Sequence, residues 1–140
     1  MSTHEQHYGV GDNSYKAAGE LAGIRQLVDS FYDFMESLPE AGKIVAMHPA
    51  DLSISRQKLT YFLSGWLGGP RLYQEHFGSI NIPGVHRHLP IAEKERDAWL
   101  LCMEKAIDCQ PYETSFKTYS LTQLAVPAER IRHACELSQP

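Results

Sequence analysis

The sequence lacks the features that place many proteins in a class at first sight. It has three cysteines, Cys102, Cys109 and Cys135, which are widely spaced and form no Cys-x-x-Cys pair, so neither a disulfide framework nor a structural zinc site is indicated. The longest apolar run, Ala98 to Met103, is far shorter than the ~20 residues that cross a bilayer. The opening residues are polar and hold no apolar segment of a signal peptide. We therefore expect reduced thiols in a cytoplasmic protein with no membrane partner.

A strong excess of either charge is also missing. The formal net charge is −4 and the calculated pI is about 5.9, so the chain has no general attraction to phosphate backbones and nucleic acid is not an expected partner. With 43% hydrophobic and 21% charged residues, the composition is that of a globular domain. At 140 residues the chain has room for one core. We expect a flexible N-terminal arm over residues 1–14 and one domain over residues 15–140.

No alternation of period two is long enough to build a sheet, whereas helical spacing recurs throughout, so the expected fold class is all-α. The first long helix is expected to end near Leu38-Pro39, with one apolar face formed by Ile24, Leu27, Val28, Phe31, Tyr32 and Met35. A second should begin after Asp51 or Ser53 and stop at Gly68. Two more are expected, from about Glu93 to Pro111 and over residues 114–137, the last kinked at Pro127.

Common catalytic motifs are absent as well. There is no nucleophile elbow, phosphate loop or dinucleotide fingerprint, and the seven histidines include no His-Glu-x-x-His pair that would gather a zinc ion. The acidic pairs Glu93 with Asp97 and Glu95 with Asp97 indicate a solvated helix start rather than an acid–base dyad, because carboxylates favour the helix dipole there.

One histidine-containing connector does suggest a cofactor. His86 and His88 lie in a non-periodic segment between two apolar helices, where an imidazole could reach a group held between them. A haem needs one neutral nitrogen ligand, apolar walls and cations for its propionates. A solvated surface histidine is the commoner interpretation of such a loop position, and the pattern alone does not decide between the two.

Three further side chains allow two interpretations each. Tyr32 is on the apolar face of its helix, either as a core residue whose hydroxyl finds a carbonyl or as a hydroxyl presented to a ligand. Trp99 has the same ambiguity, as core packing or as an indole donor in a pocket. His48 follows a short apolar stretch and could cap a helix end or face a site.

The order of these features resembles a known family. The segments that carry the resemblance follow one another as Phe31-Tyr32, Met47-His48-Pro49, Phe62-Leu63 with Trp66-Leu67-Gly68-Gly69-Pro70, Arg87-His88-Leu89-Pro90 and Glu95-Arg96-Asp97-Ala98-Trp99-Leu100. Over roughly Tyr15 to Cys135 the sequence is similar to the truncated haemoglobins, and within them to group II. Each segment alone is weak, but their shared order is specific.

The resemblance implies a truncated globin fold, a two-over-two helical sandwich around haem b (iron protoporphyrin IX). It implies His88 as the iron ligand, and Tyr32, His48 and Trp99 as polar residues on the opposite, distal side. It also implies that three residues of the distal helix face the haem, namely Leu59, Phe62 and Leu63. The implied cations for the propionates are Lys58 and Arg87.

The implied function is reversible binding of oxygen, nitric oxide and carbon monoxide. Each well-aimed neutral donor contributes on the order of 1 kcal/mol, so Tyr32 and Trp99 together should slow oxygen release. Slow release disfavours transport and favours nitric oxide detoxification or peroxide chemistry, supported by an electron-donating reductase. The expected assembly is a monomer or weak dimer. A second hypothesis lets Tyr32, as phenolate, or His48 coordinate ferric iron.

Two departures and two alternatives remain. Between Pro90 and Glu95 the chain is two residues shorter than the family pattern, and Ser55 stands where many globins carry a distal histidine. The alternatives to a ligand-binding globin are a haem-based redox or gas sensor, and a haem-free helical binding module in which the tryptophans are core residues.

Overall fold

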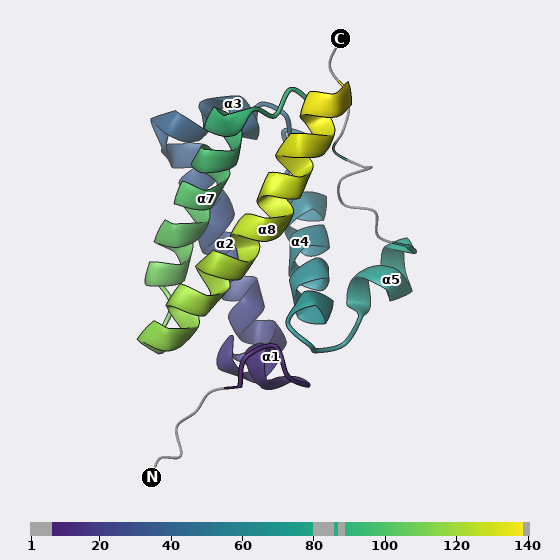
Figure 1. Cartoon of the computed structure of the whole chain (residues 1–140), viewed down its shortest axis with the longest axis vertical. Helices are drawn as coiled ribbons and strands as arrows, with labels where there is room; N and C mark the ends of the chain where they lie inside the picture. The colour runs from purple at the N-terminus through teal and green to yellow at the C-terminus, as the bar shows by residue number, and fades with distance from the viewer. Residues whose placement is uncertain (1–6, 80–85, 87–88, 139–140) are drawn as a thin grey trace.

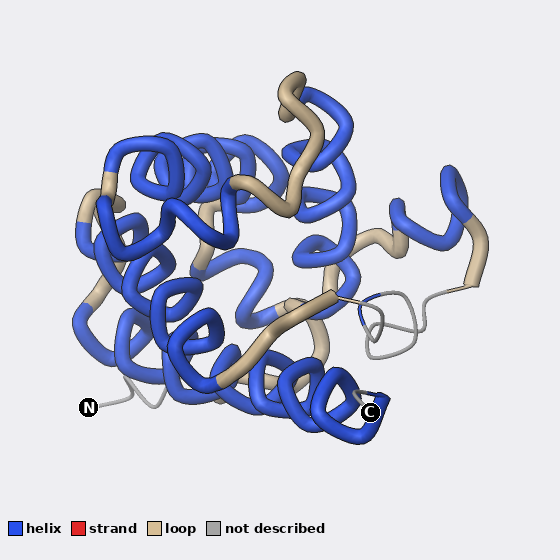
Figure 2. The backbone as a smooth tube through the Cα atoms, turned by 90° about the horizontal axis from the view of Figure 1, so that it is seen from above, coloured by secondary structure: helices blue, strands red, loops and turns tan. Residues whose placement is uncertain are grey.

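The computed structural model describes residues 7–79, 86 and 89–138, and over these residues it contains helices and no strands. Four long helices form two antiparallel pairs (Figure 1): α2 (Glu20–Ser37) with α4 (Ser53–Trp66), and α7 (Glu93–Asp108) with α8 (Thr114–Ser138). The view from above shows the same helices crossing in two layers (Figure 2). The all-α fold class and the two-over-two arrangement are confirmed.

Helix α2 follows the apolar spacing of its sequence. It begins after Gly19, whose φ of 87° is a left-handed conformation that favours glycine, and it ends one residue before Leu38. Every residue of the expected apolar face is buried: Ile24, Leu27, Val28, Phe31, Tyr32 and Met35.

Helix α4 begins and ends at the expected signals. The Asp51 carboxylate accepts hydrogen bonds from the backbone N–H of Ser53 at 2.9 Å and from its hydroxyl at 2.7 Å, which fixes the first turn. The helix stops before Gly68, which has a φ of 94°. A Cβ at Gly68 would collide with the Gly11 carbonyl, so this turn requires glycine.

The remaining elements join the two pairs. Short segments that the sequence pattern did not indicate, a 3₁₀ turn (Pro39–Ala41) and α3 (Gly42–Val45), connect α2 to α4. Helix α5 (Leu72–Phe77) follows α4 after a short turn. Helix α8 runs through Pro127 as one continuous helix. Among the described residues, none of the helices is both long and apolar enough to cross a membrane.

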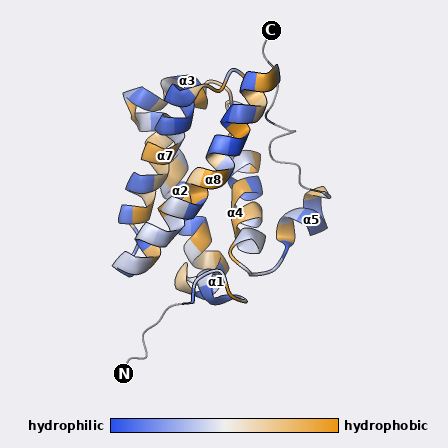
Figure 3. Ribbon diagram, viewed as in Figure 1, coloured by the Kyte–Doolittle hydropathy of each residue, from blue (hydrophilic) through white to orange (hydrophobic). Residues whose placement is uncertain are grey.

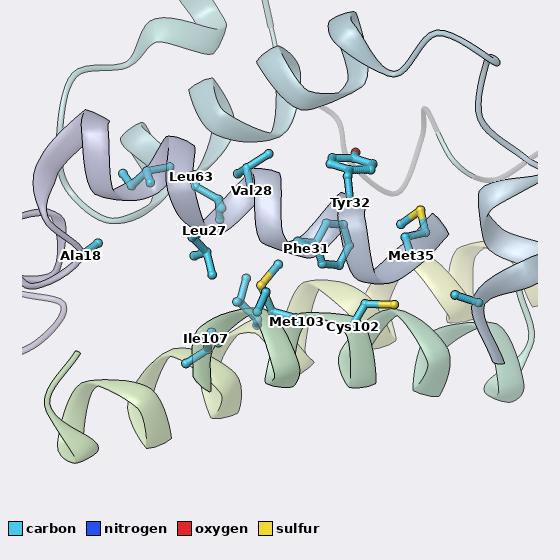
Figure 4. Close-up of a cluster of buried hydrophobic side chains, with 14 of the residues drawn as sticks. Ala18, Leu27, Val28, Phe31, Tyr32, Met35, Leu63, Cys102, Met103 and Ile107 are labelled. Carbon is cyan, nitrogen blue, oxygen red and sulfur yellow. The ribbon is translucent and has the colours of Figure 1, made fainter. Parts of the chain in front are cut away.

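The core lies mainly between α2 and α7. Each long helix carries hydrophobic residues on one side and hydrophilic residues on the other (Figure 3). Figure 4 shows Phe31 of α2 on the side of Cys102 and Met103 of α7, whereas Tyr32 lies on the side of α4. This difference in direction separates Tyr32 from its core neighbours and places it beside the cavity described below.

The N-terminal segment that the structure describes packs against the body of the protein. The Tyr8 hydroxyl lies 2.7 Å from the hydroxyl of Ser115, and the Tyr8 ring packs against Phe116 and Tyr119 of α8. Helix α1 (Asn13–Ala17) follows, with the Ser14 hydroxyl accepting from the Gly9 N–H at 2.9 Å. Residues 1–6 of the expected arm lie outside the described residues.

Candidate functional site

A cavity of about 470 Å³ lies between the two helix pairs. Its volume falls within the ~300–1,000 Å³ typical of cofactor and ligand sites. The residues that line it are Tyr32, Ile44, Met47, His48, Ser55, Lys58, Leu59, Phe62, Tyr73, His86, Leu89, Ile91, Glu95, Arg96, Trp99, Leu124, Pro127, Ala128 and Ile131. Aliphatic and aromatic side chains make up most of the wall, and the polar groups are few.

Helix α4 supplies one wall of the cavity through residues one turn apart. Ser55, Leu59 and Phe62 are four and three positions apart, so they share a helix face, and all three line the cavity. Lys58 lines it at an exposed position, with its ammonium 5.4 Å from the centre of the Phe77 ring. Leu63 lies in the hydrophobic core and is not among the lining residues.

Tyr32 reaches the cavity from α2. Its hydroxyl donates to the backbone carbonyl of Ser55 at 3.4 Å, a long hydrogen bond that a ligand could replace. Burial raises the pKa of Tyr32 to about 12, against the opposing effect of the Arg56 charge. The phenol therefore keeps its proton at physiological pH and can act as a donor, and burial opposes the phenolate required by the ferric-coordination hypothesis.

Trp99 reaches the same cavity from α7. Its ring packs edge-on against Phe31 with centroids 5.1 Å apart, which fixes the plane of the indole. The ring lines the cavity, and no hydrogen-bond partner of the indole N–H is found among the described residues. Trp99 therefore brings an indole, which can donate one hydrogen bond, to the lining of a mostly apolar cavity.

His48 both caps a helix end and lines the cavity. Its Nδ1 lies 2.8 Å from the carbonyl oxygen of Ile44, which can only accept, so Nδ1 carries the proton. In the neutral ring Nε2 is then an acceptor. The ring also packs edge-on against Tyr32, with centroids 5.7 Å apart. The two interpretations of His48 are therefore compatible, but a neutral His48 does not donate into the cavity.

Glu95 departs from the sequence interpretation. It was expected on a solvated helix start, yet its side chain is only 8% exposed. Its carboxylate accepts from the Ala92 N–H at 2.8 Å and lies 3.4 Å from the Lys43 ammonium. Burial alone would raise the pKa of Glu95, but the Ala92 N–H and Lys43 outweigh burial and hold that pKa below its ordinary value. The carboxylate is thus charged, paired and part of the cavity wall.

Glu95→Gln is expected to lower the free energy of unfolding at pH 7 by up to about 1 kcal/mol, because glutamine keeps an acceptor for Ala92 but loses the pair with the exposed Lys43. Since the folded-state pKa is depressed, the contribution is complete above the ordinary carboxyl pKa of about 4.3 and is lost as pH falls through the folded value. Urea unfolding of both proteins between pH 7 and pH 3 measures it. A difference that grows as the pH falls contradicts this assignment.

The expected iron ligand His88 and the expected propionate partner Arg87 lie outside the described residues. The neighbouring His86 is described and lines the cavity. Its carbonyl oxygen accepts from the Leu89 N–H at 2.9 Å and from the buried Cys135 thiol at 3.0 Å. The bond from Cys135 ties His86 to α8 at the edge of the cavity.

Several lining residues were not singled out in the sequence. Two others, Ser55 and Glu95, were noted in the sequence but not assigned to the site, although each shares a helix face with an expected site residue: Ser55 is one turn before Leu59, and Glu95 is one turn before Trp99. No comparable signal marks the α8 residues, because Leu124, Ala128 and Ile131 have the spacing of ordinary core positions.

Two helix pairs crossing around a mostly apolar cavity with a few inward polar groups define a two-over-two, globin-like ligand-binding protein. The comparisons with known proteins agree. Residues 13–132 match the family model of the bacterial-like globins. The group 2 truncated haemoglobin YjbI of Bacillus subtilis is 34% identical over 87% of this chain and 89% of its own length.

Solved structures give the same result. A group II two-on-two haemoglobin from Agrobacterium tumefaciens has a TM-score of 0.81 and 34% identity over 94% of this chain and 98% of its own. A truncated oxygen-avid haemoglobin from Bacillus subtilis has a TM-score of 0.77 and 33% identity over 84% and 97%. This chain belongs to the truncated haemoglobin family, in group II.

Proposed function

We propose that the chain binds haem b in this cavity and binds oxygen and other small diatomic ligands reversibly. The observation that carries the proposal is a mostly apolar cavity of about 470 Å³ whose lining includes the indole of Trp99 and the phenol of Tyr32. The Bacillus subtilis relative described as oxygen-avid supports it.

The described residues fit a haem. A porphyrin needs apolar walls, which Leu59, Phe62 and Leu124 supply here, and a cation at the rim for its propionates, which the exposed Lys58 can supply. From the family resemblance, we assign to His88 the nitrogen that would hold the iron and to Arg87 a second cation that would pair with a propionate. Bound there, haem supplies iron with a coordination position open to small ligands.

The chain's own residues then set how a ligand is held. Trp99 donates from a ring whose plane is fixed by Phe31. Tyr32 keeps its proton and can turn its hydroxyl from the Ser55 carbonyl toward the cavity, giving up a bond of 3.4 Å. Neutral His48 accepts, and so suits a ligand that carries a proton of its own.

Two donors favour slow release of oxygen, and slow release suits chemistry better than transport. We therefore propose nitric oxide detoxification, with peroxide chemistry as the second candidate because the acceptor nitrogen of His48 suits a protonated ligand. Rapid mixing of oxygen-loaded protein with nitric oxide, beside a peroxidase assay, separates the two. Stoichiometric conversion to nitrate supports the first, whereas turnover of peroxide alone supports the second.

The binding step itself is tested by titrating the purified chain with haem. We expect saturation at one haem per chain, a Soret absorption band, and a shift of that band when carbon monoxide is added to the reduced protein. The absence of a saturable Soret band contradicts haem binding and favours a haem-free helical module.

A further inference from the structure

Arg56 lies beside the cavity without lining it, and it gathers several partners from the neighbouring helix. Its Nη1 donates to the carboxylate of Asp29 at 3.1 Å and to the backbone carbonyl of the same residue at 3.2 Å. Its Nη2 donates to Asp33 at 3.2 Å and to Glu36 at 3.4 Å. The Arg56 side chain is 26% exposed, and its partners are 63%, 72% and 54% exposed.

The three acids lie on one stripe of α2, because positions 29, 33 and 36 are separated by four and three residues. Like charges at these spacings repel each other on a helix. One guanidinium placed among them relieves that repulsion. An isolated exposed ion pair restrains a side chain little. Here three carboxylates and a carbonyl accept from one planar guanidinium, and together they fix the position and orientation of the Arg56 guanidinium.

The fixed guanidinium lies 5.5 Å from the centre of the Tyr32 ring. The Tyr32 hydroxyl donates to the carbonyl of Ser55, the residue immediately before Arg56. Two consecutive residues of α4 therefore contact the ring and the hydroxyl of one tyrosine. Figure 4 shows Tyr32 on the side of α2 that faces α4, away from Cys102 and Met103.

We propose that Arg56 is a positioning residue for Tyr32: the carboxylates of Asp29, Asp33 and Glu36 hold its guanidinium against the ring and thereby fix where the Tyr32 hydroxyl meets a ligand. The inference rests on the proposed function, because it concerns how Tyr32 donates to a ligand bound in the cavity. Arg56 acts through Tyr32 and touches no ligand itself.

Two variants with opposite changes of charge test the proposal. Arg56→Gln removes the cation, and the triple variant D29N/D33N/E36Q keeps the cation but releases it. Positioning predicts that both variants shift the C–O stretching frequency of bound carbon monoxide in the same direction. It also predicts that both raise the oxygen dissociation rate constant about threefold or more, a size typical of coupled neighbours. Frequency shifts of opposite sign indicate direct action of charge on the ligand and overturn the proposal.

Controls separate positioning from general loss of structure. Arg25 of α2 lies 6.0 Å from the centre of the Tyr61 ring of α4 and neither residue lines the cavity, so Arg25→Gln is expected to leave the frequency and the rate unchanged. If Arg56→Gln does not fold, the triple variant carries the test, because it keeps the whole Arg56 side chain.

The Tyr32→Phe background distinguishes failure of this proposal from failure of the proposed function. In that background Arg56→Gln should add nothing to either measurement, and an undiminished effect overturns positioning through Tyr32. If Tyr32→Phe alone leaves oxygen dissociation unchanged, the donor role of Tyr32 is wrong. Even then, comparing the C–O frequency shift caused by Arg56→Gln in the parent and in the Tyr32→Phe background shows whether Arg56 acts through Tyr32.

Discussion

Trp99→Phe is expected to raise the rate constant of oxygen dissociation about tenfold, because it removes a donor whose hydrogen bond contributes ~1.4 kcal/mol in a water-poor cavity. Phenylalanine retains an aromatic ring to pack against Phe31, so the main group that this substitution removes is the indole N–H. Stopped-flow replacement of oxygen by carbon monoxide measures the rate.

Trp66→Phe is the matched control for this experiment. Trp66 lies on α4, stacks on Phe62 and is not among the lining residues, so the same substitution there should leave the oxygen rate unchanged. Combining Trp99→Phe with Tyr32→Phe should accelerate release further than either change alone. If neither single variant nor the double variant differs from the parent, the two-donor account of slow release is wrong.

His88→Gly is expected to weaken haem binding on the order of 100-fold or more, since even residues that only support a metal ligand contribute ten- to 100-fold. The measurement is a haem titration followed by the Soret band. Free imidazole should restore the band, because it can supply the missing nitrogen in the space left by the side chain.

His86→Gly is the control two positions away. It lines the cavity, so we expect a modest effect on the spectrum but retained haem. If His86→Gly loses haem and His88→Gly keeps it, the iron ligand is His86 and not His88. Such a result would match the two-residue shortening between Pro90 and Glu95.

Much of the fold could be predicted because local signals and packing agree. The spacing from Ile24 to Met35 gave the buried face of α2, and Asp51 and Gly68 gave the ends of α4. The short segments between α2 and α4 were missed because three or four residues are too few to show a period. Their helical form depends on packing against α2 and α7 rather than on their own sequence.

The candidate site was predictable only in part. Tyr32, His48 and Trp99 are brought to one cavity from three elements, as the resemblance implied. The only sequence signal for Glu95 was its place one turn before Trp99, and nothing in the sequence indicated its pair with Lys43, which is distant in the chain. The connector at residues 87–88 lies outside the described residues, so the iron ligand stays a prediction.

The hydrogen bond from His48 to Ile44 has a consequence for mutagenesis at this position. One nitrogen of the ring closes the end of α3, and the same side chain lines the cavity, so local folding and ligand chemistry share a single residue. An apolar replacement removes both at once and leaves the Ile44 carbonyl with only the Met47 N–H as its donor. Asparagine offers an amide N–H₂ for that carbonyl but lacks the basic nitrogen of histidine. A comparison of the apolar and asparagine replacements therefore separates the effect of His48 on the end of α3 from its effect on a ligand.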